Sequence, residues 1–208
     1  YVSFNNQLWR IVKVDSEGDI KLVLAEATET AYVWDDSYNS KEDENYGNTD
    51  DYLHTSIRKT LNEYYKSNFD KDSKAKIVSK NLCIGKYSLT DDFGDDFSSE
   101  KECSIIKENE KIGLLTANDY HLASLGSGCT NLKSMECVNR NYLSDQNYIN
   151  SWLLNSVSEN TPKVLYLYTS IGKSFASSEK KINPVIYIST KTVVVTGKGN
   201  KTKPYIVK

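Results

Sequence analysis

A cluster of carboxylates within residues 91–96 is the part of the sequence best suited to hold a metal ion. Asp91, Asp92, Asp95 and Asp96 flank a single glycine. Closely spaced oxygen ligands around a glycine are what a hard cation such as Ca²⁺ selects. No Glu follows at the spacing that a Ca²⁺-binding EF-hand loop uses for its bidentate ligand. A solvated acidic loop is therefore the favoured interpretation, Ca²⁺ is the alternative, and no other cofactor is expected.

Imidazole-dependent catalysis has few candidates, because His54 and His121 are the only histidines. His54 directly precedes a predicted helix and His121 lies within another. A packing or hydrogen-bonding role is therefore favoured for both over catalysis. Residues 125–129 lack the spacing of the G-x-S-x-G nucleophile elbow. Because no nucleophile and base are visible, we expect a protein that is not an enzyme, and a hydrolase is the least favoured alternative.

Aromatic residues are numerous, with 15 tyrosines and three tryptophans. Trp34 stands beside Asp35 and Asp36, where an acidic segment rich in Asn and Ser begins. Aromatic rings with polar neighbours suit carbohydrate stacking and protein interfaces, since they bury a large area at a small entropy cost. These three residues are therefore the predicted ligand contacts, with a core position as the alternative for Trp34. The strand-like surroundings of Trp9 and Trp152 predict that both lie in the core.

The cysteines form an even set without the C-x-x-C spacing of zinc sites and redox pairs. Two disulfides are the favoured interpretation, and three connectivities are open to Cys83, Cys103, Cys129 and Cys137. We predict the pairs 83–103 and 129–137, because each brackets a polar segment. Two disulfides would indicate an oxidising, extracytoplasmic setting. The alternative is four buried free thiols in a cytosolic protein.

The charge balance argues against nucleic acid as a partner. The 26 Lys and Arg residues nearly balance the 28 Asp and Glu residues, and only three of the basic residues are arginines. Neutralising several phosphates takes a clustered basic stripe. No apolar run reaches the 18 residues that would suggest a membrane span. The sequence opens at Tyr1 without an initiator Met, so we expect any targeting or membrane segment to precede it.

Periodicity predicts a hairpin, two helices and a series of C-terminal strands. Residues 8–14 and 20–25 alternate apolar and polar positions around a turn. Residues 55–65 repeat apolar side chains on one helical face, and Thr116 with Asp119 has the spacing of a capping box. A strand-like segment, 112–115, precedes that second helix. Further strand-like segments form what is predicted to be a meander: 164–168, 172–176, 185–188, 192–196 and 205–207.

The absence of a βαβ pattern, of repeats and of linkers predicts one α+β domain over residues 1–208. Its sheet is expected to be mainly antiparallel, with two or more short helices.

The order of several segments resembles an uncharacterised family of surface domains from Gram-positive bacteria. The matching segments span nearly the whole chain: 4–12, 56–65, 112–120, 137–143, 152–154 and 183–188. The closing hairpin of the family is matched by Gly197, Gly199 and Pro204. Family members are often joined to a type IV prepilin leader helix, so the resemblance implies a minor pilin, a pseudopilin or a similar envelope-anchored head domain. It supplies no catalytic residue.

The order of helix, tryptophan strand and terminal strand also resembles the C-type-lectin-like fold. Relatives commonly carry Val-Arg-Pro where this chain has Ile182, Asn183 and Pro184, so a role of that arginine is not carried over. The Glu-Pro-Asn and Gln-Pro-Asp triplets of sugar-binding lectins are not found, and Ca²⁺-dependent sugar recognition is not carried over either.

We therefore expect a non-enzymatic extracellular head domain at the cell surface or in a type IV pilus, with adhesion or assembly contacts made by its loops. The expected partners are other pilus or envelope subunits, together with a host or surface glycan or protein ligand. A membrane would be reached only through a leader helix. The alternative is a structural envelope subunit that packs against neighbouring protomers and has no host ligand.

Overall fold

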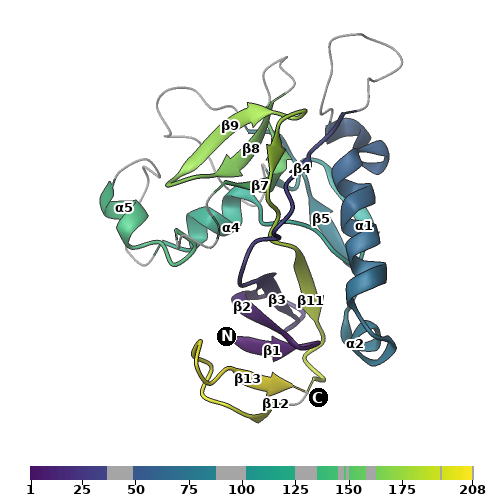
Figure 1. Ribbon diagram of the computed structural model, residues 1–208, viewed down its shortest axis with the longest axis vertical. Helices are drawn as coiled ribbons and strands as arrows, with labels where there is room; N and C mark the ends of the chain where they lie inside the picture. Colours follow the sequence, from purple (N-terminus) through teal and green to yellow (C-terminus); the bar gives the residue numbers. More distant parts are fainter. Residues whose placement is uncertain are drawn as a thin grey trace.

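The computed structural model describes residues 1–36, 49–87, 102–124, 135–144, 148, 150–157, 163–192 and 194–207. These residues form a single mixed α/β domain in which antiparallel sheets predominate and the helices are few and short (Figure 1). The predicted fold class is confirmed at this level. No described helix has the length and apolar character required to cross a membrane.

The largest sheet has six strands and contains the predicted N-terminal hairpin. Trp9 of one hairpin strand pairs with Leu24 of the other, and Val14 pairs with Ile20. All neighbouring strands are antiparallel except the first and last of the chain, which run parallel. In spatial order the strands are β11 (Val185–Ile188), β3 (Ile20–Leu24), β2 (Gln7–Val14), β1 (Val2–Phe4), β13 (Tyr205–Val207) and β12 (Val194–Thr196).

Three smaller sheets complete the strand structure. One contains β7 (Ser151–Ser156), β8 (Lys163–Leu167) and β9 (Ile171–Phe175). The two others are pairs, β5 (Lys80–Cys83) with β6 (Ile106–Glu110), and β4 (Tyr32–Val33) with β10 (Glu179–Lys180).

The five predicted C-terminal strands are all present, but the prediction of a continuous meander is wrong. β8 pairs with β9, whereas β11 pairs with β3 of the N-terminal hairpin and β13 pairs with β1. The strand expected over residues 112–115 is reduced to an isolated bridge between Gly113 and Val185. Long-range pairing with the N-terminal strands thus competes successfully with pairing between sequence neighbours.

Local capping explains where the two predicted helices begin. In α1 (Ser56–Asn68), the Thr55 side chain accepts from the backbone N–H of Arg58, and Ile57 and Leu61 are buried. In α4 (Ala117–Leu122), Thr116 and Asp119 form the predicted capping box. The other helical segments are the 3₁₀ segment η1 (Thr49–His54), α2 (Lys71–Lys76) and α5 (Met135–Asn139).

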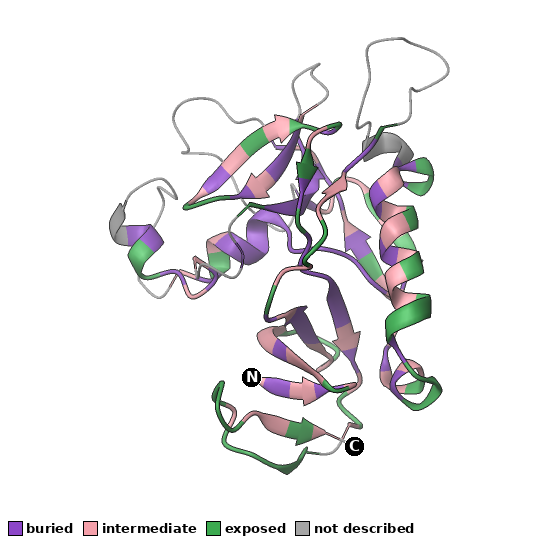
Figure 2. Cartoon of the chain, in the orientation of Figure 1, coloured by how far each residue is buried: buried purple, intermediate pink, exposed green. Residues whose placement is uncertain are grey.

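Two clusters of buried side chains form the core (Figure 2). The first contains all three tryptophans, and Trp9 and Trp152 occupy the core positions expected from the sequence. The second lies among β7, β8 and α4 and includes Leu153, Leu165 and Tyr120. The Trp152 indole is held by a hydrogen bond to the Tyr32 carbonyl (2.7 Å), which connects the three-stranded sheet to β4.

The terminal strands lie side by side, and both marked chain ends lie at the same end of the molecule (Figure 1). Val2 pairs with Tyr205, and the Tyr205 N–H donates to the Tyr1 carbonyl at 2.9 Å. This end carries β12 and β13, whereas β9 and β4 lie toward the opposite end.

Candidate functional site

The cysteines are engaged in disulfide bonds wherever the structure describes them. Cys83, the last residue of β5, is bonded to Cys103, with a Cα–Cα distance of 4.4 Å. Cys137 in α5 is also disulfide-bonded. Cys129 lies outside the described residues, so the 129–137 pairing stays a prediction.

The predicted Ca²⁺ ligands Asp91, Asp92, Asp95 and Asp96 also lie outside the described residues. The Cys83–Cys103 bond closes the segment that contains them, as the sequence predicted. The metal site itself therefore stays a prediction.

The predicted ligand contacts of Trp34, Asp35 and Asp36 are placed in different environments. Trp34 is fully buried, and its indole N–H donates to the Leu153 carbonyl at 3.2 Å. It is therefore a core residue in this structure and offers no ring surface to a ligand. Asp35 is also buried, while exposed Asp36 accepts a hydrogen bond from the Ser56 hydroxyl. The sequence Trp-Asp-Asp is compatible both with a surface loop and with a buried position. Sequence alone therefore leaves both alternatives open for Trp34.

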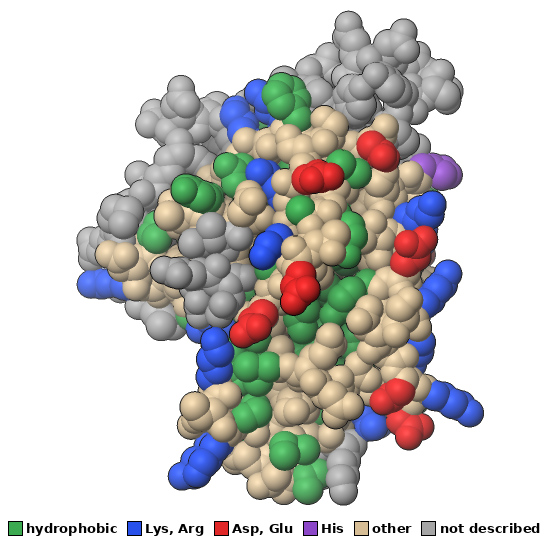
Figure 3. All heavy atoms as spheres, viewed as in Figure 1, with side chains coloured by type: hydrophobic (Ala, Val, Ile, Leu, Met, Phe, Trp, Pro, Cys, Tyr) green, Lys and Arg blue, Asp and Glu red, His purple; other side chains and the backbone are tan. Residues whose placement is uncertain are grey.

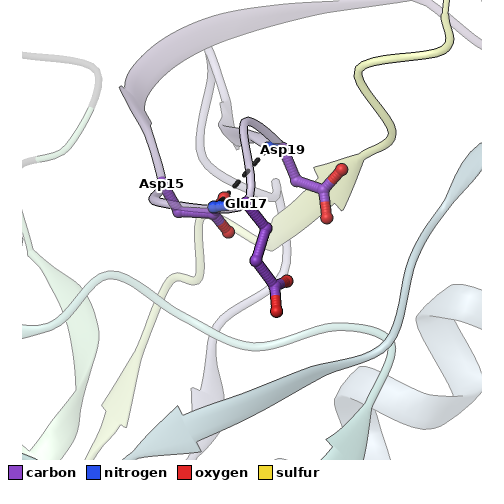
Figure 4. Close-up of side chains that lie close together, drawn as sticks. All are labelled: Asp15, Glu17 and Asp19. Atoms are coloured by element: carbon purple, nitrogen blue, oxygen red, sulfur yellow. Dashed lines mark hydrogen bonds between the residues drawn. The ribbon is translucent and has the colours of Figure 1, made fainter.

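An acidic cluster that the sequence analysis did not single out lies in the turn between β2 and β3. The turn brings the carboxylates of Asp15, Glu17 and Asp19 together (Figure 4), with oxygen atoms that all lie within 4.8 Å of one another. The Asp15 carboxylate accepts from the backbone N–H groups of Glu17 (3.0 Å) and Asp19 (2.9 Å). Carboxylates at alternate positions of a short turn are the signal in the sequence, but this pattern by itself predicts only a turn.

The ammonium group of Lys80 is bound to this acidic cluster. Its Nζ lies 2.8 Å from Asp15 and 2.8 Å from Asp19 and also contacts Glu17. Burial alone would raise the pKa of Asp15, but Lys80 and the turn N–H groups hold that pKa below its ordinary value. Burial alone would lower the pKa of Lys80, and the three carboxylates raise it instead. Oxygen ligands of this kind suit a hard cation, yet here an internal ammonium group neutralises them.

A second charged group lies in the interior, where Lys21 of β3 meets Asp119 of α4. Lys21 Nζ lies 2.5 Å from Asp119 Oδ2, and Lys13 Nζ lies 3.3 Å from Oδ1. Burial alone would raise the pKa of Asp119, but the two lysines and the Thr116 N–H hold it below its ordinary range. Burial alone would lower the pKa of Lys21, and Asp119 raises it. The ion pair therefore stays charged in the core.

Glu102, next to Cys103, is a further buried ionisable group. Its Oε2 accepts from the Tyr87 hydroxyl and from the Asn118 N–H, each at 3.0 Å. Burial raises its pKa, and the nearby charge of Asp119 raises it further. Two carboxylates with oppositely shifted pKa values can serve as an acid–base pair in an enzyme. Here only 4% of Glu102 and 1% of Asp119 is exposed, so neither reaches a surface where a substrate could bind. Glu102 attaches α4 to the disulfide-closed segment through the Asn118 N–H, whereas Asp119 attaches α4 to β3 through Lys21.

The histidines lie in separate parts of the molecule. His54 ends η1 and lines an open groove of about 580 Å³ along α1, which also contains Arg58, Lys59 and Glu63. Within this groove Arg58 Nε donates to Glu110 Oε1 at 2.8 Å. His121 lies in α4, and partial burial lowers its pKa.

A smaller hollow of about 310 Å³ lies beside Arg10 and is lined by Asn139, Asn141 and Tyr142. The Arg10 guanidinium lies over the Tyr1 ring at 5.3 Å and the Tyr142 ring at 5.0 Å. The Asn141 amide donates to the Tyr120 carbonyl at 2.6 Å, so it serves the fold. The hollow is therefore a polar surface feature with an aromatic wall.

Comparison with known proteins adds no assignment to these groups. No family model matches the chain, and no curated protein or solved structure matches it either.

Proposed function

We propose that this chain is a non-enzymatic domain of the cell surface or of a type IV pilus, and that it contributes adhesion or assembly contacts. The observation that carries the proposal is the Cys83–Cys103 bond, which persists in oxidising compartments and is uncommon in the cytosol. The bond is joined to the interior through Glu102, whose backbone carbonyl accepts from the Gly85 N–H at 2.7 Å. The disulfide bond is thus connected to the hydrogen-bonded interior of the domain.

The roles of the charged groups support a binding or assembly domain over an enzyme. Lys80 neutralises the carboxylates of the β2–β3 turn, and Lys21 neutralises Asp119. Each of these groups stabilises the contact of two chain segments that are distant in sequence. These two lysines and their carboxylate partners are therefore committed to holding the domain together.

The position of the chain ends supports a tethered head domain. Because β1 and β13 are neighbours, a leader joined before Tyr1 would leave the molecule beside β13. The end that carries β9 and β4 would then point away from the anchor (Figure 1). A surface domain held in this way would present that far end to a host or surface ligand and keep the terminal strands close to other subunits.

A C-type-lectin-like arrangement belongs to the same proposal. Its support is the chain order of α1, the Trp152 strand β7 and the strand β11 that follows Pro184. A lectin-like frame would carry ligand contacts on its loops, as a surface domain requires.

The proposal is tested first by intact mass, measured with and without reductant, on protein purified from the cells that make it. We expect a gain of two hydrogens for each disulfide and a crosslinked peptide that contains Cys83 and Cys103. Protease treatment of intact cells is the second measurement, with a cytosolic protein as the control. Free thiols at both cysteines, or full protection from the protease until the cells are lysed, would overturn the surface assignment.

The structural-subunit alternative is favoured by one observation, the exposed edge strand β12. Chemical crosslinking on intact cells separates the two roles. A packing subunit is expected to crosslink to other envelope subunits and to show no binding to host cells or glycans, whereas an adhesin retains such binding as a purified domain.

A further inference from the structure

The strand β12 and the turn that follows it form a basic edge of the molecule. We define the basic edge as the described residues 191, 192 and 194–206. Residues 189–208 contain five lysines and neither Asp nor Glu, although the whole chain carries a net charge of −2. Lys191, Lys198, Lys201 and Lys203 are all exposed. The chain therefore concentrates positive charge at the end where its termini lie.

The basic edge also exposes apolar side chains. Val194 is 51% exposed, Val195 is 50% exposed, and Ile206 on the neighbouring strand β13 is 45% exposed. In Figure 3, hydrophobic side chains reach the surface at the lower end of the molecule, and Lys or Arg side chains project at its lower left. Apolar contacts are thus available next to positive charge.

The backbone of β12 is paired on one side only. β13 lies on one side, and no strand of the described ranges pairs with the other. The three residues of β12 read Val-Val-Thr, without a charge or a proline. Charged residues and prolines commonly protect open strand edges, because unpaired N–H and C=O groups recruit further strands. The register shift between Val194 and Thr196 faces β13, and it leaves both exposed valines at the surface.

The turn after β12 holds the lysines in place beside this edge. Lys198 N–H donates to the Lys203 carbonyl at 2.8 Å, and Lys203 N–H donates to Asn200 Oδ1 at 2.7 Å. Gly197 has a φ of +113°, and a Cβ there would lie 2.1 Å from the Pro204 carbonyl oxygen, so only glycine fits. The charge is therefore presented by an ordered turn next to the open strand.

We propose that the basic edge binds an extended acidic segment of a partner protein, which adds to β12 as a further strand. The backbone groups on the open side of β12 would supply the ladder, and Val194 and Val195, which are adjacent in the strand, would meet side chains on opposite faces of the added segment. The lysines supply the complementary charge that selects an acidic sequence. A second copy of this strand is disfavoured, because pairing β12 with itself would bring the lysines of two copies together. A lipid surface offers no extended backbone.

This inference deepens the assembly role in the proposed function, but its test does not depend on export. The probe is a fluorescein-labelled ten-residue peptide that alternates Glu with Val or Thr, added to the full chain and followed by fluorescence anisotropy. Two matched probes have Lys in place of Glu, or the same acidic sequence with N-methyl groups on alternate residues. We expect binding of the acidic peptide that weakens as salt rises, since exposed charge pairs are screened. We expect both matched probes to bind at least about tenfold more weakly than the acidic peptide.

Charge reversal on the protein tests where the probe binds. The variant Lys198→Glu/Lys203→Glu is expected to weaken binding about fivefold or more, because it replaces two attractive surface charge pairs with repulsive ones. The matched control Lys59→Glu changes an exposed lysine on α1 and is expected to leave binding unchanged. Circular dichroism on both variants checks that they fold, and the peptide controls on the unaltered chain do not depend on them.

Several outcomes would overturn the proposal. Equal binding of the N-methylated peptide would mean charge attraction without strand addition. Stronger binding to vesicles of phosphatidylglycerol than to the acidic peptide would identify a lipid surface as the occupant. A dimer in solution that the double variant abolishes would identify a second copy. No peptide binding at low salt would remove the site altogether. Free thiols in the mass experiment would remove the surface localisation but leave these results unaffected.

Discussion

Lys21 and Asp119 are 98 residues apart in the sequence and form a buried ion pair, with 2.5 Å between Nζ and Oδ2. Lys21 lies on β3 of the six-stranded sheet, between β11 and β2, and Asp119 is also half of the capping box of α4. One carboxylate therefore caps the start of α4 and neutralises a lysine that would otherwise be buried without a partner.

Removal of this carboxylate should be costly. We expect Asp119→Ala to lower the free energy of unfolding by about 3–5 kcal/mol, because it leaves the ammonium group of Lys21 buried and unpaired. Urea denaturation measures the effect. The control is Lys13→Ala, which removes the more exposed partner of Asp119 and should cost about 1 kcal/mol or less. Similar losses for the two variants would contradict a dominant role of the buried pair.

Glu102 should make stability depend on pH in the opposite sense to Asp119. Burial raises the folded-state pKa of Glu102 above its ordinary value of 4.5, so the unfolded chain releases this proton first as pH rises. The contribution of Glu102 is present below pH 4.5 and is lost as pH rises through the folded pKa. The pKa of Asp119 is lowered, so its contribution is present above 3.8 and is lost as pH falls through the folded pKa.

The variant Glu102→Gln isolates the first of these effects. Gln keeps an oxygen that can accept from Tyr87 and Asn118 but has no proton to release. We expect it to gain stability relative to the unaltered chain at pH 8 and to lose this advantage at pH 4, as measured by thermal unfolding at both values. A difference that does not change with pH would show that Glu102 keeps its ordinary pKa.

Loss of the Cys83–Cys103 bond should destabilise the domain through the unfolded state. The two cysteines are separated by 20 positions, and closure of a loop of this length contributes about 3 kcal/mol in the chain-entropy model. We expect Cys83→Ser/Cys103→Ser to lower the free energy of unfolding by about that amount in oxidising buffer. Addition of reductant should lower the free energy of unfolding of the unaltered chain more than that of the variant. An equal response of the two proteins would contradict the prediction.

Lys80 should be required to neutralise the turn between β2 and β3. Replacing it in Lys80→Met leaves the carboxylates of Asp15, Glu17 and Asp19 within 4.8 Å of one another without their ammonium partner. We expect the free energy of unfolding to fall by about 1–2 kcal/mol, because the variant removes several partly exposed ion pairs. Higher salt should recover part of it, because the repulsion of the three carboxylates is screened.

The effect of Ca²⁺ on the melting temperature provides a second test of Lys80→Met. The unaltered chain should show no rise in melting temperature that depends on this turn, since Lys80 occupies it. The Lys80→Met chain should be stabilised by millimolar Ca²⁺, because three carboxylates without a counterion suit a hard cation. A triple variant, Asp15→Asn/Glu17→Gln/Asp19→Asn, controls for Ca²⁺ binding elsewhere. An equal response of Lys80→Met and the unaltered chain would contradict the prediction.

Sequence alone determined the elements that depend on near neighbours. Thr55 caps α1, and Thr116 with Asp119 caps α4, because a capping side chain acts on backbone N–H groups within three residues. The β2–β3 hairpin follows from alternation on both sides of one turn. The bond between Cys83 and Cys103 was likewise predicted from the segment that these residues bracket.

Tertiary structure decided which of these elements meet. No local pattern distinguishes pairing of β13 with β1 from pairing with a sequence neighbour, since the edges of most strands offer the same backbone groups. Lys80 is distant in sequence from the turn whose carboxylates it binds, and Lys21 is distant from Asp119, so neither pairing leaves a signal in the sequence. The burial of Trp34 and the exposure of β12 follow from the same assembly of sheets. The physical reason is that caps and turns are satisfied within a few residues, whereas burial and ion pairing are satisfied only after distant strands pack.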